Sequence, residues 1–160
     1  MSKTLILFRH AHAEWQSDND HNRPLSIRGE QEAKKIGQLL SHRHSPPQQL
    51  ICSSAVRAES TASIANTSGD WMCFLQVDKA LYNTDASSAL NYIKSLSNNK
   101  ERIMLVGHEP TWSDLSNDLL IEKQKLVFST GMMVAINFEL SYWSEIEIGK
   151  GKLAWVLGPN

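Results

Sequence analysis

The sequence of 160 residues is poor in the features that mark several protein classes. It contains two cysteines, Cys52 and Cys73, which form neither a CxxC pair nor a zinc-binding spacing. We therefore expect buried free thiols in a cytoplasmic protein that needs no metal and no other cofactor. The apolar run nearest the N-terminus, residues 5–8, is too short for a signal sequence or a membrane span, so we expect no membrane contact.

An excess of charge of either sign is also lacking. The chain carries 16 Lys and Arg against 17 Asp and Glu, which gives a formal net charge of -1. Without a basic excess to displace counterions, we expect no general affinity for nucleic acid. The five prolines and eight glycines are scattered, with no repeat or linker among them. We therefore predict a single domain over residues 1–160, and we expect a monomer.

Short apolar runs alternate with amphipathic segments over the first three quarters of the chain. Runs typical of buried strands cover residues 4–8, 50–53, 73–77 and 103–106. Helical spacing of apolar residues occurs in residues 26–40 and in segments that begin near Ser54, Ala86 and Pro110. Ser54 and Asp85 are predicted to cap two of these helices.

The last quarter of the chain has a different pattern. Two strand-like runs, residues 132–138 and 153–157, flank a polar segment and predict a hairpin at the edge of the sheet. Strands that alternate with helices indicate a parallel sheet with helices on both faces. The sequence therefore predicts an α/β fold of three α/β/α layers, with a mainly parallel central sheet and an antiparallel edge near the C-terminus.

Basic side chains follow three of the predicted strands. Arg9 and His10 follow the first strand, Arg57 comes soon after the second, and His108 follows the run at 103–106. Ligands bind outside the carboxyl ends of the strands in an open parallel sheet, and neighbouring strands are about 4.8 Å apart. Arginine forks and the N-termini of the following helices suit phosphate oxygens. The four residues therefore predict a phosphate pocket.

A histidine in such a pocket has an evident chemical use. A neutral imidazole can attack phosphorus and form a phosphohistidine, which water then hydrolyses. The arginines and the second histidine would stabilise the charge on the equatorial oxygens. The same arginines also suit a non-catalytic module that binds phosphoproteins, and this alternative stays open.

Four motifs follow one another along the chain. They are Arg9-His10-Ala11, Arg23-Pro24-Leu25-Ser26 with Arg28-Gly29, Ser53-Ser54-Ala55-Val56-Arg57-Ala58, and Val106-Gly107-His108-Glu109-Pro110. In this order they resemble the histidine phosphatase superfamily, and in particular its small SixA-like phosphohistidine phosphatase branch. The resemblance implies a phosphoglycerate mutase-like fold without a cap domain. It also implies His10 as the nucleophile, with Arg9, Arg57 and His108 binding the phosphoryl group.

The chain departs from larger members of that superfamily in its general acid. Residues 81–84 contain no carboxylate, and Glu109 stands where one branch of the superfamily has an aspartate. An alkoxide leaving group benefits strongly from a general acid, whereas an imidazole leaves more readily. We therefore predict that the substrate is a phosphohistidine on a protein, for instance a phosphotransfer domain. A small phosphate ester, with Glu109 as the acid, is the alternative.

Some residues near the predicted pocket keep two interpretations. Arg23 either contacts the phosphate or pairs with Asp20. Glu109 is either a general acid or a carboxylate favoured by the dipole at a helix start. A metal site is the less favoured interpretation of three residues in the first polar loop, which are His12, Glu14 and His21.

Overall fold

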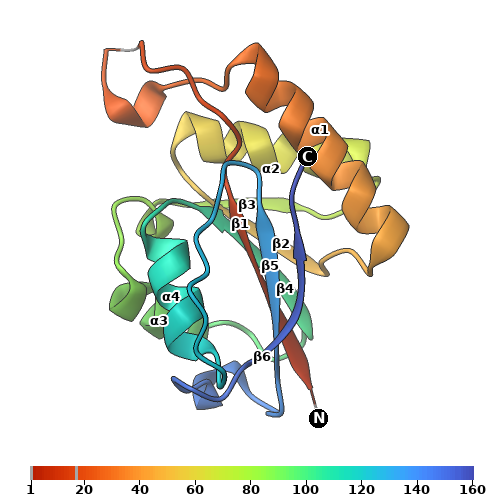
Figure 1. Ribbon diagram of the computed structural model, residues 1–160, viewed down its shortest axis with the longest axis vertical. Helices are drawn as coiled ribbons and strands as arrows, with labels where there is room; N and C mark the ends of the chain where they lie inside the picture. The colour runs from red at the N-terminus through yellow and green to blue at the C-terminus, as the bar shows by residue number, and fades with distance from the viewer. Residues whose placement is uncertain (1, 17) are drawn as a thin grey trace.

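A six-stranded sheet forms the centre of the molecule (Figure 1). This computed structural model describes residues 2–16 and 18–160. The strands are β1 (Lys3–Arg9), β2 (Gln49–Ser53), β3 (Leu75–Asp78), β4 (Arg102–Gly107), β5 (Met133–Phe138) and β6 (Lys152–Leu157). They lie in the order β3-β2-β4-β1-β5-β6. The first four are parallel to one another, and β5 and β6 form an antiparallel edge, as the sequence predicts.

Helices cover both faces of this sheet. They are α1 (Ile27–Arg43), α2 (Val56–Ser68), α3 (Ala86–Lys94) and α4 (Thr111–Leu119). The first two lie against one face and the last two against the other (Figure 1). Single turns of 3-10 helix occur at Asp20–Asn22, Lys79–Leu81 and Trp143–Glu145. The predicted three layers are confirmed, and in the described residues no inserted segment forms a cap domain.

The apolar run of β1 shows why a strand of this kind must be continuous. Leu5 and Leu7 pack in the core shared with α3 and α4, whereas Ile6 and Phe8 pack against α1 and α2. All four side chains are fully buried. Successive side chains point to opposite faces, so a strand that is covered on both sides needs an apolar residue at each position. Burial of each such side chain contributes roughly 1.5–3 kcal/mol.

One of the two predicted helix caps is confirmed and the other is wrong. The Asp85 carboxylate accepts a hydrogen bond from the Ser88 amide at 2.8 Å and caps α3. In α2 the N-cap is Ala55, which makes no side-chain cap bond. Ser54 Oγ lies 3.0 Å from His21 Nε2 instead. The hydroxyl group that was predicted to cap the helix therefore contacts a residue 33 positions away in the chain.

The two cysteines differ in burial. Cys52 is fully buried in β2, and burial raises the pKa of its thiol to about 12. Cys73 is only partly buried, and its Sγ contacts the carbonyl oxygen of Pro47 at 3.1 Å. Both thiols are free. The expectation of buried thiols is therefore confirmed for Cys52 and wrong for Cys73, because β3 begins at Leu75 and leaves residue 73 outside the sheet.

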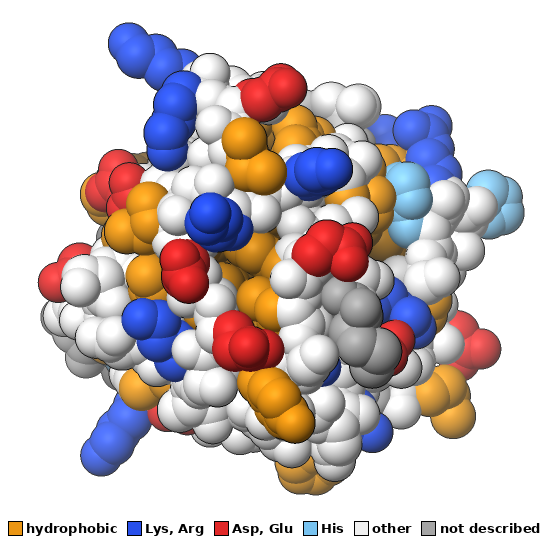
Figure 2. Space-filling model, turned by 90° about the horizontal axis from the view of Figure 1, so that it is seen from below, with side chains coloured by type: hydrophobic (Ala, Val, Ile, Leu, Met, Phe, Trp, Pro, Cys, Tyr) orange, Lys and Arg blue, Asp and Glu red, His pale blue; other side chains and the backbone are white. Residues whose placement is uncertain are grey.

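The surface is mixed in character. On the face shown in Figure 2, acidic and basic side chains are interspersed among small hydrophobic areas. This distribution agrees with the net charge of -1. Among the described residues, no helix combines the length and the apolar character that crossing a bilayer requires.

Gly29, in the first turn of α1, gives a test of this packing. A Cβ atom built at Gly29 would lie 1.9 Å from the carbonyl oxygen of His12. We expect Gly29→Ala to lower the free energy of unfolding by about 2 kcal/mol or more, because the backbone must shift to relieve the clash. Urea denaturation measures the change. Gly158→Ala is the control, since its Cβ would have nothing within 4 Å, and equal midpoints for both variants would contradict the close approach.

Candidate active site

The carboxyl ends of three neighbouring strands bring the predicted pocket residues together. In the parallel pairing of β1 with β4, Arg9 is opposite Gly107, so that His10 and His108 follow side by side. The centroids of the two imidazole rings are 5.2 Å apart. Arg57, in the first turn of α2, reaches the same place from beyond β2, and its Nη2 is 3.4 Å from His108 Nδ1. These residues line a cavity of about 630 Å³.

His10 lies buried in this cavity with an uncharged ring. The residue is 8% exposed, and its Nδ1 is 2.8 Å from the carbonyl oxygen of Ala11. Because a carbonyl oxygen only accepts, Nδ1 carries the hydrogen and Nε2 keeps its lone pair. Burial lowers the pKa of His10 to about 3, and the nearby charges of Arg57 and Arg9 act in the same direction. The imidazole is therefore a neutral nucleophile at neutral pH.

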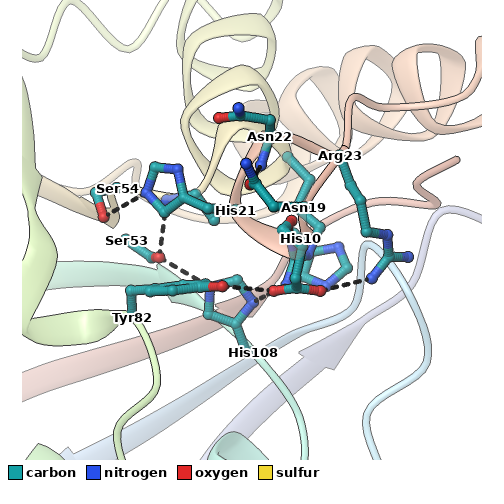
Figure 3. Close-up of polar contacts among 12 residues, drawn as sticks. His10, Asn19, His21, Asn22, Arg23, Ser53, Ser54, Tyr82 and His108 are labelled. Carbon is teal, nitrogen blue, oxygen red and sulfur yellow. Dashed lines mark hydrogen bonds and ion pairs between the residues drawn. The ribbon is translucent and has the colours of Figure 1, made fainter. Parts of the chain in front are cut away.

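His108 is held by a partner on each ring nitrogen. Its Nε2 lies 2.8 Å from Ser53 Oγ (Figure 3). Arg57 Nη2 lies 3.4 Å from its Nδ1. Arginine only donates, so Nδ1 accepts and Nε2–H donates to the serine hydroxyl. Burial, followed by the charge of Arg57, lowers the pKa of His108 to about 4. Sequence analysis did not assign a role to Ser53, although the residue belongs to the motif that contains Arg57.

The two arginines have donors left over. Arg9 Nη1 donates to the carbonyl oxygen of Phe128 at 2.8 Å, and Arg57 Nη1 donates to that of Asp20 at 2.7 Å. The Nε atom of each guanidinium is buried and has no hydrogen-bond partner among the described residues. An unpaired buried donor costs about 1–3 kcal/mol. Both guanidinium groups also line the cavity and give it a positive wall, which suits a phosphoryl group.

An acidic residue that sequence analysis did not place in the pocket also lines it. The Asp20 carboxylate accepts hydrogen bonds from Tyr82 Oη at 2.6 Å, from Arg57 Nη2 at 3.1 Å and from Arg23 Nη1 at 3.1 Å. The first of these bonds has the largest effect, and together they hold the pKa of Asp20 well below its usual range. Arg23 thus pairs with Asp20, which was one of its two predicted roles, and lies at the cavity wall (Figure 3).

Glu109 lies at the cavity but is occupied by the start of α4. Its Oε1 accepts a hydrogen bond from the Ser113 amide at 2.8 Å, and the Ser113 hydroxyl donates to Oε2. These contacts are those of a carboxylate that stabilises a helix N-terminus, the second of the two roles considered for it. The side chain is therefore held by the helix start.

The three residues considered for a metal site have other partners or lie apart. His12 Nδ1 is 2.7 Å from Ser26 Oγ, and His21 Nε2 is 3.0 Å from Ser54 Oγ. Glu14 is exposed. In the part of the chain that the structure describes, no group of three or more His, Cys, Asp or Glu side chains is arranged to hold a metal ion.

Comparisons of the sequence give one family and several relatives. The family model of the histidine phosphatase superfamily (branch 1) matches residues 5–87. An uncharacterized chloroplastic protein of Arabidopsis thaliana is 32% identical over 130 residues, which are 74% of this chain and 60% of that protein. A Mycobacterium tuberculosis protein is 33% identical over 97 residues, 61% of this chain and 59% of its own length. This chain thus spans about three fifths of these two relatives.

Solved structures share the fold over almost the whole chain. A SixA protein from Nakamurella multipartitia has a TM-score of 0.86 at 21% identity and covers 99% of this chain and 97% of its own. The protein histidine phosphatase SixA in complex with tungstate has 0.83 at 20%, covering 98% and 97%. A mycobacterial glucosyl-3-phosphoglycerate phosphatase has 0.68 at 15%, covering 96% and 97%. The phosphoglycerate mutase-like fold is confirmed.

The ionisation of His10 can be measured directly. We expect its ring to stay neutral, with hydrogen on Nδ1, from pH 8 down to about pH 5, because its pKa is about 3. Protonation favours the unfolded chain, in which a histidine titrates near 6.5. The folded protein therefore keeps its full stability with respect to His10 above pH 6.5, and it loses stability as the pH falls from 6.5 toward 3. Nitrogen-15 NMR of the imidazole rings reports the state, with the protein unfolded in urea as the control. A His10 imidazolium at pH 6 would contradict the assignment.

Proposed function

Because this chain belongs to the histidine phosphatase superfamily, we propose that it is a phosphatase and that its substrate is a phosphohistidine on another protein. The observation that supports this most is the buried neutral His10, whose Nε2 lone pair is left for a ligand in a cavity that Arg9 and Arg57 also line. Such a site offers a nucleophile and an anion-binding frame at the same place.

The reaction proceeds in two displacements. His10 Nε2 attacks phosphorus and forms a P–N bond, while the bond from phosphorus to the substrate breaks and its electron pair leaves with the substrate. Water then forms a P–O bond, the P–Nε2 bond breaks, and its electron pair returns to Nε2. The proton lost by water departs with the phosphate or to solvent. Arg9 and Arg57 bind the equatorial oxygens, where charge must be stabilised. His108 joins them when its Nε2–H turns from Ser53 Oγ to the phosphoryl group.

The state of the carboxylates favours a good leaving group. Asp20 is held ionised by its three donors, and Glu109 is bonded to Ser113, so neither is ready to protonate a leaving alkoxide. An imidazole has an ordinary pKa near 6.5 and leaves without such help. The likeness in fold to the protein histidine phosphatase SixA, over nearly the full length of both chains, supports the same class of substrate. The free cysteines agree with action in the cytoplasm.

The covalent intermediate is the first test. We expect His10→Ala to lower turnover of a phosphohistidine protein by at least about 1,000-fold, because the nucleophile is lost. Wild-type enzyme quenched in base should retain phosphate that acid releases, and the variant should retain none. His42→Ala, which changes an exposed histidine at the end of α1, is the control. Full turnover by His10→Ala would refute the nucleophile, and detectable wild-type turnover excludes a module that only binds phosphoproteins.

A phosphomonoesterase for small metabolites is the second candidate, because Glu109 lies at the cavity and the fold is shared with a glucosyl-3-phosphoglycerate phosphatase. We expect Glu109→Gln to change kcat/KM for alkyl and aryl phosphates by similar factors, since its carboxylate serves the start of α4. A general acid would show a selective loss of about 100-fold or more on alkyl phosphates. That selective loss would favour the second candidate. Ser113→Ala, which removes the hydroxyl bonded to Glu109, is the matched control.

A further inference from the structure

Asp20 is a negatively charged residue in a cavity whose arginines suit the binding of a negatively charged ligand. Its carboxylate bridges Arg57 and Arg23, and its own backbone oxygen takes a second donor of Arg57. Hydrogen bonds from Tyr82 and both arginines keep it ionised, because they hold its pKa well below the usual range. A negative charge there weakens phosphate binding, so its presence needs a compensating use.

The position of Asp20 in depth suggests what that use is. His10 and Arg57 lie inside the cavity: the His10 residue is 8% exposed and the Arg57 side chain 7%, whereas the Asp20 side chain is 52% exposed. In an in-line displacement the leaving group is opposite the nucleophile. A phosphoryl group on His10 would therefore have its leaving group toward the open side of the cavity. The half-exposed Asp20 carboxylate and Tyr82, which donates to it, line the same cavity.

We propose that Asp20 is a specificity-determining residue, whose carboxylate accepts the N–H of a protonated phosphoimidazole and disfavours leaving groups that carry negative charge. The first half of this statement rests on the proposed phosphohistidine substrate. The second half is a charge effect and holds for any phosphate ester. In both cases the effect comes from the same feature, a carboxylate held in a fixed position beside the leaving group.

The transfer step balances without an added acid. In a protonated phosphoimidazole, one ring nitrogen carries phosphorus and the other carries hydrogen. His10 Nε2 forms its bond to phosphorus, and the substrate P–N bond breaks with its electron pair going to the ring. The ring then leaves as neutral imidazole, and its hydrogen stays in place throughout. An acceptor for that N–H stabilises the protonated form, which is the better leaving group.

A purely structural role for Asp20 makes a different prediction. If the carboxylate only oriented Arg57 and Arg23, its loss would reduce the hydrolysis of every substrate by the same factor. A specificity role changes the ratio between substrates. The measurement is therefore a comparison of kcat/KM among phosphoimidazole, phenyl phosphate and 4-carboxyphenyl phosphate, the last two of which differ by one negative charge away from the reacting bond.

We expect Asp20→Asn to lower kcat/KM for phosphoimidazole relative to phenyl phosphate by about tenfold. We expect it to raise the value for 4-carboxyphenyl phosphate relative to phenyl phosphate by about fivefold, because a like charge is removed. Asp18→Asn makes the same chemical change at an exposed position of the same loop and should leave both ratios unchanged. Asp20→Glu keeps the negative charge, so the three substrates should rank by kcat/KM in the same order as they do with the wild-type enzyme.

The outcomes separate the two proposals. Unchanged ratios in Asp20→Asn, at whatever absolute rate, would overturn the specificity role. A wild-type enzyme that hydrolyses phenyl phosphate but not phosphoimidazole would overturn the phosphohistidine substrate, while the ester pair would still measure the effect of charge. A circular dichroism melt of each variant shows that the compared proteins are folded. If Asp20→Asn does not fold, loss of the substrate order in Asp20→Glu overturns the charge effect.

Discussion

The burial of an uncharged imidazole among fixed cations is the constraint on which this site depends. His10 is kept neutral by burial and by its positive neighbours, and its bond to Ala11 fixes which nitrogen holds the lone pair. A charged imidazole in the same place would lose its solvation and repel Arg9 and Arg57. The cations that make the cavity attractive to phosphate are thus the same groups that prepare the nucleophile.

The sheet brings Arg9, His10 and His108 to short range. The pairing of β1 with β4 places Arg9 opposite Gly107, and both strands then continue into a histidine. Trp112 connects α4 to the end of β1, because its Nε1 donates a hydrogen bond to the carbonyl oxygen of Phe8 at 3.0 Å. A Cβ atom at Gly107 would lie 2.6 Å from the same indole ring, so glycine permits the helix to approach. The rigid core of the fold therefore extends to the site itself.

The residues that follow buried strands could be located from the sequence. In the polar loop, Asp20 was predicted only as a possible partner of Arg23 and was not placed in the pocket. Arg9, His10 and His108 are predictable because an apolar run and a parallel sheet fix where the next side chain goes. Asp20 has no such periodicity around it. Its partners Arg57 and Tyr82 are 37 and 62 residues away in the chain, and only the folded structure brings them together. Ser54 shows the same limit, since its local cap pattern yields to His21.

Asp20 occupies only part of the hydrogen-bonding capacity of Arg57. Its Nη1 and Nη2 hold Asp20, while its Nε is buried and unpaired among the described residues. A guanidinium has five N–H donors, and Nη1 uses one of its two hydrogens on Asp20, so a phosphoryl oxygen that takes the other does not have to displace the carboxylate. Asp20 can therefore remain in place during turnover and hold the arginine in a fixed plane. Fixed donors need little reorganisation when charge develops in the transition state, which is the condition under which electrostatic stabilisation is strongest.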